Sequence, residues 1–118
     1  MDIREMKAGR ELDALVAEIV MDGCWTIDDE TVFIWEKEGG ASTIFSPSTD
    51  MTAAWKVRKW LLDNRGGVRL ERFCDAETPE YCEVYRGKEC KLIQVWATTT
   101  PEAICKAALL VMEDEQCL

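Results

Sequence analysis

The segment Thr31–Glu36 is the feature that most constrains the fold of this chain, because it is apolar on both sides of an extended backbone. Side chains alternate along a strand, so Val32 and Ile34 would face one side. Phe33 and Trp35 would then face the opposite side. A strand that is apolar on both faces has to be covered on both. The segment therefore predicts a sheet with helices on each side, rather than two layers with one solvated face.

Residues 8–21 show the clearest periodicity of an amphipathic helix. Their apolar side chains recur at positions i, i+3, i+4, i+7 and i+8, which places them on one face. Asp22 and Gly23 then provide a C-terminal stop. The expected buried stripe is Leu12, Leu15, Val16, Ile19 and Val20, and the expected solvent-facing residues are Arg10, Glu11, Asp13 and Glu18.

A second helix is expected over residues 49–62, after a polar loop. Ser48 or Thr49 is the expected N-cap, and Asp50 in the first turn complements the positive end of the helix dipole. Asn64 or a following glycine can take the left-handed position at the C-terminus. The expected core-facing residues of this helix are Ala53, Ala54, Val57, Trp60 and Leu61.

The last helix is expected over residues 100–112, because Pro101 suits the first helical position and Glu102 the first turn. Only Lys106 is charged between positions 103 and 112. A helix that is apolar nearly all round is either deeply packed or shared with a second subunit. We expect a homodimer, with Ala107, Leu109 and Leu110 as its candidate interface residues.

Five strands are expected between these helices, separated by short turns and a glycine-containing loop at residues 38–43. The segments are Cys24–Ile27, Thr31–Glu36, Val68–Cys74, Tyr81–Tyr85 and Cys90–Thr98. Short links favour antiparallel neighbours. The predicted fold is α+β: a three-layer α/β/α sandwich with a mostly antiparallel five-stranded sheet, in the order α-β-β-α-β-β-β-α. Its 118 residues fit one domain, 1–118.

The charge of the chain argues against direct contact with nucleic acid. Its 14 basic and 23 acidic residues give a net charge of −9, which repels phosphates. An acidic protein can instead imitate DNA, and the carboxylate clusters at 28–30 and 113–115 would carry that role. The simpler interpretation is that these clusters are solvated ends of secondary structure.

No apolar run approaches the ~20 residues that a membrane span needs, and the N-terminus lacks the apolar core of a signal peptide. We therefore expect the protein in the cytoplasm, with no membrane partner. Its cysteines follow no disulfide or zinc-site spacing, and the chain has no histidine, so we expect reduced thiols, no metal and no cofactor. The six cysteines are Cys24, Cys74, Cys82, Cys90, Cys105 and Cys117.

Catalysis has little support in the sequence. Without histidine, a serine or cysteine nucleophile lacks its commonest base, and no phosphate-binding glycine motif or zinc-protease motif is present. We expect a protein that is not an enzyme and has no catalytic residues.

The loop before the second helix is the better candidate site. Hydroxyls and unpaired N–H groups at a helix start can hold an anionic or hydroxyl-rich ligand. The alternative is a capping motif without a ligand. The tryptophans at 25, 35, 55, 60 and 96 could wall a pocket for a flat base, although such residues are more often core, and Trp55 lies off the apolar stripe. The candidate ligand-binding residues are Ser46, Ser48, Thr49, Asp50 and Trp55.

Three stretches together resemble the phage ABA sandwich domain, a family of small phage and prophage proteins. They are Ala8-Gly9-Arg10-Glu11-Leu12-Asp13-Ala14-Leu15-Val16-Ala17-Glu18 with Val20-Met21, Ser48-Thr49-Asp50 with Ala53-Ala54-Trp55 and Val57, and Thr100-Pro101 with Ala103-Ile104-Cys105 and Ala107-Ala108-Leu109. The resemblance implies layers of helix, sheet and helix, a phage origin and a location in the host cytoplasm. It implies no established activity.

The function that we expect is that of a small non-enzymatic, phage-encoded accessory protein. It would act as a binding module that captures a small ligand or a host protein. One such role would be to weaken a host defence. Capture of a nucleotide-like ligand would require aromatic pocket walls and an inward-facing Arg or Lys. The alternative is an acidic decoy that imitates DNA and occupies a nucleic-acid-binding host protein.

Overall fold

The computed structural model describes residues 2–20, 25–28, 31–35, 42–64, 66–73, 77–86 and 91–116. Its helical elements are the 3-10 turn η1 (Ile3–Glu5), α1 (Arg10–Leu15), the π-helical continuation η2 (Val16–Val20), α2 (Met51–Asn64) and α3 (Thr100–Gln116). Its strands are β1 (Trp25–Asp28), β2 (Thr31–Trp35), β3 (Ser42–Ile44), β4 (Val68–Arg72), β5 (Glu80–Arg86) and β6 (Lys91–Ala97). The α+β class and the three main helices are as predicted.

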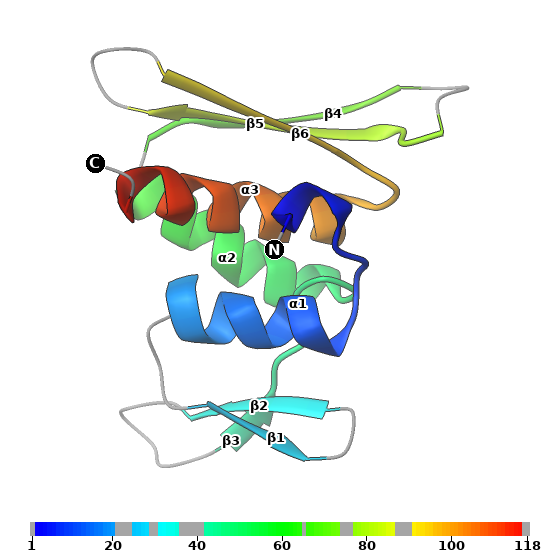
Figure 1. Ribbon diagram of the computed structural model, residues 1–118, viewed down its shortest axis with the longest axis vertical. Coiled ribbons are helices and arrows are strands. Elements are labelled where there is room, and N and C mark those ends of the chain that lie inside the picture. The colour runs from blue at the N-terminus through cyan, green and yellow to red at the C-terminus, as the bar shows by residue number, and fades with distance from the viewer. Residues whose placement is uncertain are drawn as a thin grey trace.

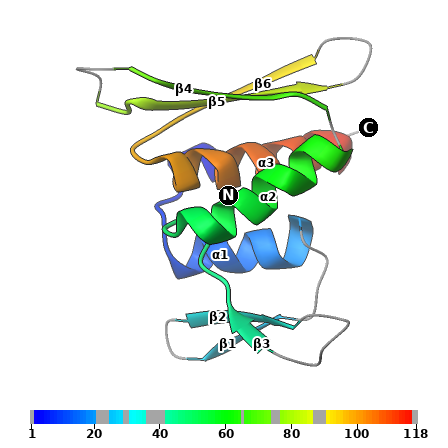
Figure 2. The same cartoon turned by 180° about the vertical axis from the view of Figure 1, so that it is seen from behind.

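The strands form two separate antiparallel sheets, β1-β2-β3 and β4-β5-β6, each paired in sequence order. Figure 1 shows α1, α2 and α3 between the two sheets, with α3 and α2 next to β4-β5-β6 and α1 next to β1-β2-β3. The view from behind shows the same layers (Figure 2). The helices therefore form the interior of the molecule, and the sheets form its two outer layers.

The prediction of a single five-stranded sheet with helices on both sides is wrong. A sixth strand, β3, occupies residues at the end of the predicted loop 38–43, and β2 pairs with β1 and β3 only. Short connections favour pairing between neighbours in sequence, and α2 lies between the two groups of strands. The observed order, α-β-β-β-α-β-β-β-α, follows from this local pairing.

Helix α3 lies at the centre of the core. It contacts β5, β6, α2, η2, α1 and η1, and it begins at Thr100 as predicted. Of the two alternatives for this apolar helix, the structure shows deep packing. Ala107 is 0% and Leu109 is 1% exposed, while Leu110 packs partly buried against the core. The first two side chains are enclosed by their own chain, so they cannot form the predicted interface with a second subunit.

The stripe predicted for the first helix faces the core, as expected. Leu12, Val16 and Val20 are buried, and Leu15 and Ile19 are partly buried against the same cluster. In α2 the buried residues are Ala53, Ala54, Val57 and Leu61, with Trp60 packed against the core. No helix in the described part of the chain is long and apolar enough to cross a membrane.

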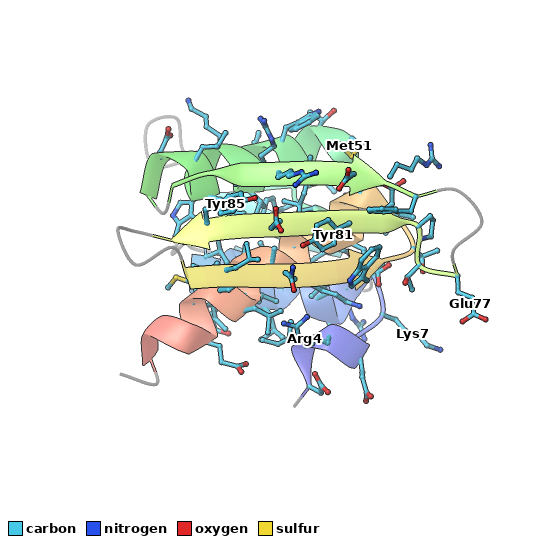
Figure 3. The ribbon with its side chains drawn as sticks, turned by 90° about the horizontal axis from the view of Figure 1, so that it is seen from above. Arg4, Lys7, Met51, Glu77, Tyr81 and Tyr85 are labelled. Atoms are coloured by element: carbon cyan, nitrogen blue, oxygen red, sulfur yellow. The ribbon has the colours of Figure 1, made fainter. Side chains whose placement is uncertain are left out.

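Sheet β4-β5-β6 has two different faces. Its inner face, against the helices, carries buried side chains: Cys82, Val84, Ile93, Val95 and Ala97. Its outer face carries Phe73, just after β4, with Tyr81, Tyr85, Leu92 and Trp96. Figures 1 and 3 show that no described element covers this outer face. The core position predicted for Trp96 is therefore wrong. The side chains of Trp25 and Trp35 lie outside the described residues.

Candidate functional site

The loop before α2 is a tight turn that leads directly into the helix. Backbone N–H groups of Thr49 and Asp50 both donate to the carbonyl of Ser46, at 3.2 and 2.9 Å. The N-cap is Asp50, whose Oδ1 accepts the N–H of Thr52 at 3.2 Å. The prediction of Ser48 or Thr49 as the N-cap is wrong by one or two positions, because the turn at Ser46 uses those residues before the helix begins.

Ser48 is a structural residue rather than an open ligand-binding group. Its Oγ accepts the N–H of Gly9 at 2.9 Å and lies 3.3 Å from the Gly9 carbonyl, to which it donates. Its own N–H donates to Oδ1 of Asp13 at 2.8 Å. Asp13, predicted to face solvent, is instead buried by this contact, and burial raises the pKa of its carboxyl above the ordinary value. The hydroxyl and the backbone N–H of Ser48 thus join the loop to the start of α1.

Two of the five candidate ligand-binding residues line a cavity of about 610 Å³ between this loop and the start of α1. Ser46 and Thr49 belong to its wall, whereas Ser48, Asp50 and Trp55 do not. The other lining residues come from the N-terminal segment: Met6, Lys7, Ala8, Gly9, Arg10, Glu11 and Asp13. No lining residue is aromatic. A flat base therefore has no stacking partner in this cavity, although Lys7 and Arg10 contribute basic residues to its lining.

Trp55 lies elsewhere, on the exposed side of α2. It is 46% exposed, which agrees with its predicted place off the apolar stripe. The guanidinium carbon of Arg58 lies over its ring, 4.8 Å from the centroid. Of the candidates predicted from sequence, Ser46 and Thr49 line the cavity and Ser48 links the loop to α1. Asp50 caps α2, and Trp55 lies on the surface of that helix.

The described residues gather most of their exposed aromatic surface on the outer face of sheet β4-β5-β6. Phe73, Tyr85, Leu92 and Trp96 are each 38–46% exposed. The rings of Phe73, Tyr81 and Trp96 are in mutual contact, with centroid separations of 4.6 to 6.2 Å. We call these five residues the aromatic face. Their registry explains the cluster, because Tyr81 pairs with Trp96 and Tyr85 with Leu92 across β5 and β6.

Glu83 lies between Tyr81 and Tyr85 on the same face of β5. The Tyr81 hydroxyl donates to Oε1 of Glu83 at 2.7 Å, and the Tyr85 hydroxyl donates to Oε2. These hydrogen bonds, that of Tyr85 first, hold the pKa of Glu83 below its ordinary value, and the nearby Arg69 guanidinium acts in the same direction. Figure 3 shows the tyrosines along β5. The aromatic face thus has the ionised carboxylate of Glu83 at its centre and apolar side chains on both sides of it.

Sequence reasoning missed the aromatic face, although a signal for it was present. Positions 81, 83 and 85 are Tyr, Glu and Tyr, while positions 82 and 84 are Cys and Val. This period-two alternation is typical of a strand with one buried and one solvated face.

The sequence is also similar to that of a known protein family. The sequence profile of the phage ABA sandwich domain matches residues 14–109, which is most of the chain. The chain belongs to the phage ABA sandwich domain family. The resemblance carried by the three helical stretches is thereby confirmed.

The fold of this phage ABA sandwich domain is also similar to a crystal structure of a phage protein from Bacillus cereus ATCC 14579. The two chains superpose with a TM-score of 0.67 at 24% sequence identity, over 96% of this chain and 94% of the other. A search of the curated proteins finds no significant match.

The described part of the phage ABA sandwich domain contains two cysteines, Cys82 and Cys105, both buried and unpaired. Burial raises the pKa of Cys82 to about 12 and that of Cys105 well above the ordinary value. Such thiols are poor nucleophiles at neutral pH. Among the described residues, no group of three or more Cys, Asp or Glu side chains is placed to hold a metal ion. The other four cysteines lie outside the described residues.

Proposed function

We propose that this phage ABA sandwich domain is a non-enzymatic accessory protein that binds a host protein, in the host cytoplasm, through the aromatic face. The observation that supports this function is the exposure of Phe73, Tyr85, Leu92 and Trp96 on one sheet surface that no described element covers. Aromatic side chains are enriched at protein interfaces, and contiguous exposed apolar patches commonly mark them.

The charges around the aromatic face indicate a partner with basic and apolar side chains. Glu83 stays ionised at its centre, and Glu71 lies at its edge beside Arg69, with Nη2 of Arg69 3.1 Å from both carboxylate oxygens. The chain as a whole carries a charge of −9, which speeds association with a basic surface. A partner Arg or Lys would meet ring faces beside the carboxylate of Glu71, whose side chain is 38% exposed, a combination that favours cations.

Two other functions named from the sequence have less support. Nucleotide capture would require aromatic walls, which the cavity beside Ser46 and Thr49 lacks. A DNA mimic would present rows of unpaired carboxylates, whereas Glu83 on the outer face is held by two tyrosines and Glu71 by Arg69. Asp29 and Glu30 of the first acidic cluster lie outside the described residues.

The test is a site-specific crosslinking experiment followed by a binding measurement. A photoreactive amino acid at position 96 should crosslink a host protein that the same amino acid at position 55 does not. The two tryptophans are equally exposed, at 46%, on different surfaces, so they form a matched pair. With the purified host protein, Trp96→Ala should weaken binding at least about tenfold, as expected for an interface anchor.

Trp55→Ala should leave the affinity for that protein unchanged. Loss of binding in both variants, or in neither, would contradict the assignment of the interface to the aromatic face. A partner that is captured only at low salt, and that also binds DNA competitively, would favour the decoy function instead.

A further inference from the structure

Strand β4 is an edge strand with an unpaired side. The N–H of Tyr85 donates to the Gly67 carbonyl at 2.8 Å, and the N–H of Phe73 donates to the Pro79 carbonyl at 2.7 Å. Hydrogen-bonded pairs alternate along an antiparallel ladder, so Arg69 and Glu71 direct their backbone groups to β5. The backbone groups of Val68, Leu70 and Arg72 therefore point away from the sheet, and no described residue bonds to them.

Helix α2 provides a floor beside this edge. In Figure 3, α2 extends past β4 in the layer below the sheet, and Figures 1 and 2 show that its C-terminal end is the end nearer to the sheet. Met51, Trp55, Arg58 and Leu62 follow one another at i, i+4, i+7 and i+11, so they share one flank of the helix. Trp55 and Leu62 are 46% and 40% exposed. An extended chain added to β4 would lie over this flank.

Arg58 places the flank close to the strands. Its charge acts on Cys82, which is paired with Leu70 and faces the helices. Its Nε is buried and has no hydrogen-bond partner among the described residues. A buried, unpaired guanidinium nitrogen is costly, and a carboxylate arriving at the β4 edge would supply its partner.

The charge of this region is opposite to that of the whole chain. Residues 56–72 contain six basic and two acidic residues, a local charge of +4 in a chain of −9. Arg72 on β4 pairs with Glu80 at 3.0 Å and still keeps 78% of its side chain exposed. The β4 edge therefore combines open backbone groups, an apolar floor and an excess of positive charge.

We propose that the β4 edge, defined by the backbone of Val68, Leu70 and Arg72 and by the α2 flank, binds an extended acidic segment of a partner protein. The segment adds to the sheet as a fourth strand beside β4, through main-chain hydrogen bonds to these three residues. Its inward side chains pack on Trp55 and Leu62, and its carboxylates pair with Arg58 and Arg72. This site is separate from the aromatic face and does not depend on it.

The test uses a synthetic peptide of about eight residues in which glutamate alternates with valine, followed by NMR of the intact chain. Addition of the peptide should slow amide hydrogen exchange at Val68, Leu70 and Arg72. Exchange at Arg69 and Glu71, whose N–H groups already bond to β5, should change little. The same peptide with N-methyl groups on alternate residues should not bind, because it cannot form the ladder.

Substitutions identify the charges that take part. Arg58→Gln should weaken the peptide roughly tenfold, the loss of one charge-assisted hydrogen bond. Lys56→Gln removes the same charge from an exposed position away from the flank and should change the affinity less than about twofold. Arg72→Gln, at a position that is 78% exposed, provides a second variant, should Arg58→Gln lower stability.

Three results would overturn the proposal. One is unchanged exchange at residues 68, 70 and 72 with saturating peptide. The second is equal binding of the N-methylated peptide or of a peptide with lysine for glutamate. The third is loss of peptide binding in Trp96→Ala, which would move the site to the aromatic face.

Discussion

The backbone N–H of Ser48 donates to Oδ1 of Asp13 at 2.8 Å, across 35 positions of sequence. Together with the bonds between Ser48 Oγ and Gly9, this contact fastens the loop before α2 to the start of α1. A loop that sequence reasoning treats as a candidate ligand site thus holds two helices together. The cavity beside it, with Ser46 and Thr49 in its wall, is shaped by that link.

Ser48→Ala should destabilise the protein through the N–H of Gly9. The substitution removes the Oγ that accepts this N–H in a partly buried position, at a cost of about 1–2 kcal/mol. Thr49→Ala, at the neighbouring exposed position, should stay within about 0.5 kcal/mol of the wild type. Unfolding in urea measures both values. Equal effects of the two substitutions would show that the link to Gly9 does not stabilise the fold.

The stability that Glu83 contributes should depend on pH. Its folded-state pKa lies below the ordinary 4.5, so its contribution is complete above pH 4.5 and is lost as the pH falls through the folded-state pKa. The wild type should therefore have a higher Tm than Glu83→Gln at pH 7, and the difference should shrink below pH 4.5.

Glu77→Gln is the control for this pH dependence, because the Glu77 side chain points into solvent (Figure 3). Its difference in Tm from the wild type should stay nearly constant over the same pH range. A Tm difference for Glu83→Gln that grew toward acid pH would contradict the interpretation of the tyrosine contacts.

Cys82 should resist alkylation in the folded protein. With a pKa of about 12, roughly one thiol in ten thousand is ionised at pH 8, and the side chain is fully buried. Peptide mass spectrometry after treatment with iodoacetamide should find Cys82 and Cys105 unmodified without denaturant and fully modified in guanidinium chloride. Native modification of Cys82 on the timescale of the denatured protein would show that this part of the sheet opens readily.

Lys106→Met should loosen the N-terminal segment. The buried Nζ of Lys106 donates to the Arg4 carbonyl at 3.0 Å and to Oε1 of Glu102 at 2.8 Å, so it fixes η1 against α3. Without it, Glu102 loses its partner, at a cost of about 1–3 kcal/mol. Limited trypsin digestion should then cleave after Arg4 or Lys7 several-fold faster than in the wild type.

Lys59→Met, at an exposed position of α2, is the matched control for the digestion. It should leave the rate of cleavage near the N-terminus unchanged. If Lys106→Met is cleaved no faster, the guanidinium of Arg4, which donates to the Gln94 carbonyl, is sufficient to hold η1 in place.

The helices could be predicted from the sequence because their signals are local. Thr100 and Pro101 mark the start of α3, and the stripe from Leu12 to Val20 marks the first helix. The burial of Asp13 could not be predicted from such local signals. Asp13 is buried where it accepts the N–H of Ser48, and a contact between residues 35 positions apart cannot be recognised from helical periodicity.

The sheets could be predicted only in part. β3 has three residues, too few for an alternation to be recognised, and its pairing with β2 creates a separate sheet. In β6 apolar residues occur on both faces of the strand, so alternation does not show which face is buried. The structure buries Ile93 and Val95 but exposes Leu92 and Trp96. An apolar side chain can contact either the protein core or a binding partner, and the period of the sequence pattern does not distinguish these two cases.

The central position of α3 has a consequence for how the protein is made. This helix follows every other element in the chain, yet it covers the inner face of β5 and β6 and contacts η1 and α1. Until α3 has left the ribosome, the nascent sheet β4-β5-β6 exposes apolar side chains on both of its faces and is prone to aggregate. Productive folding therefore requires α3, and a premature stop codon before residue 100 would leave a chain that chaperones or proteases must remove.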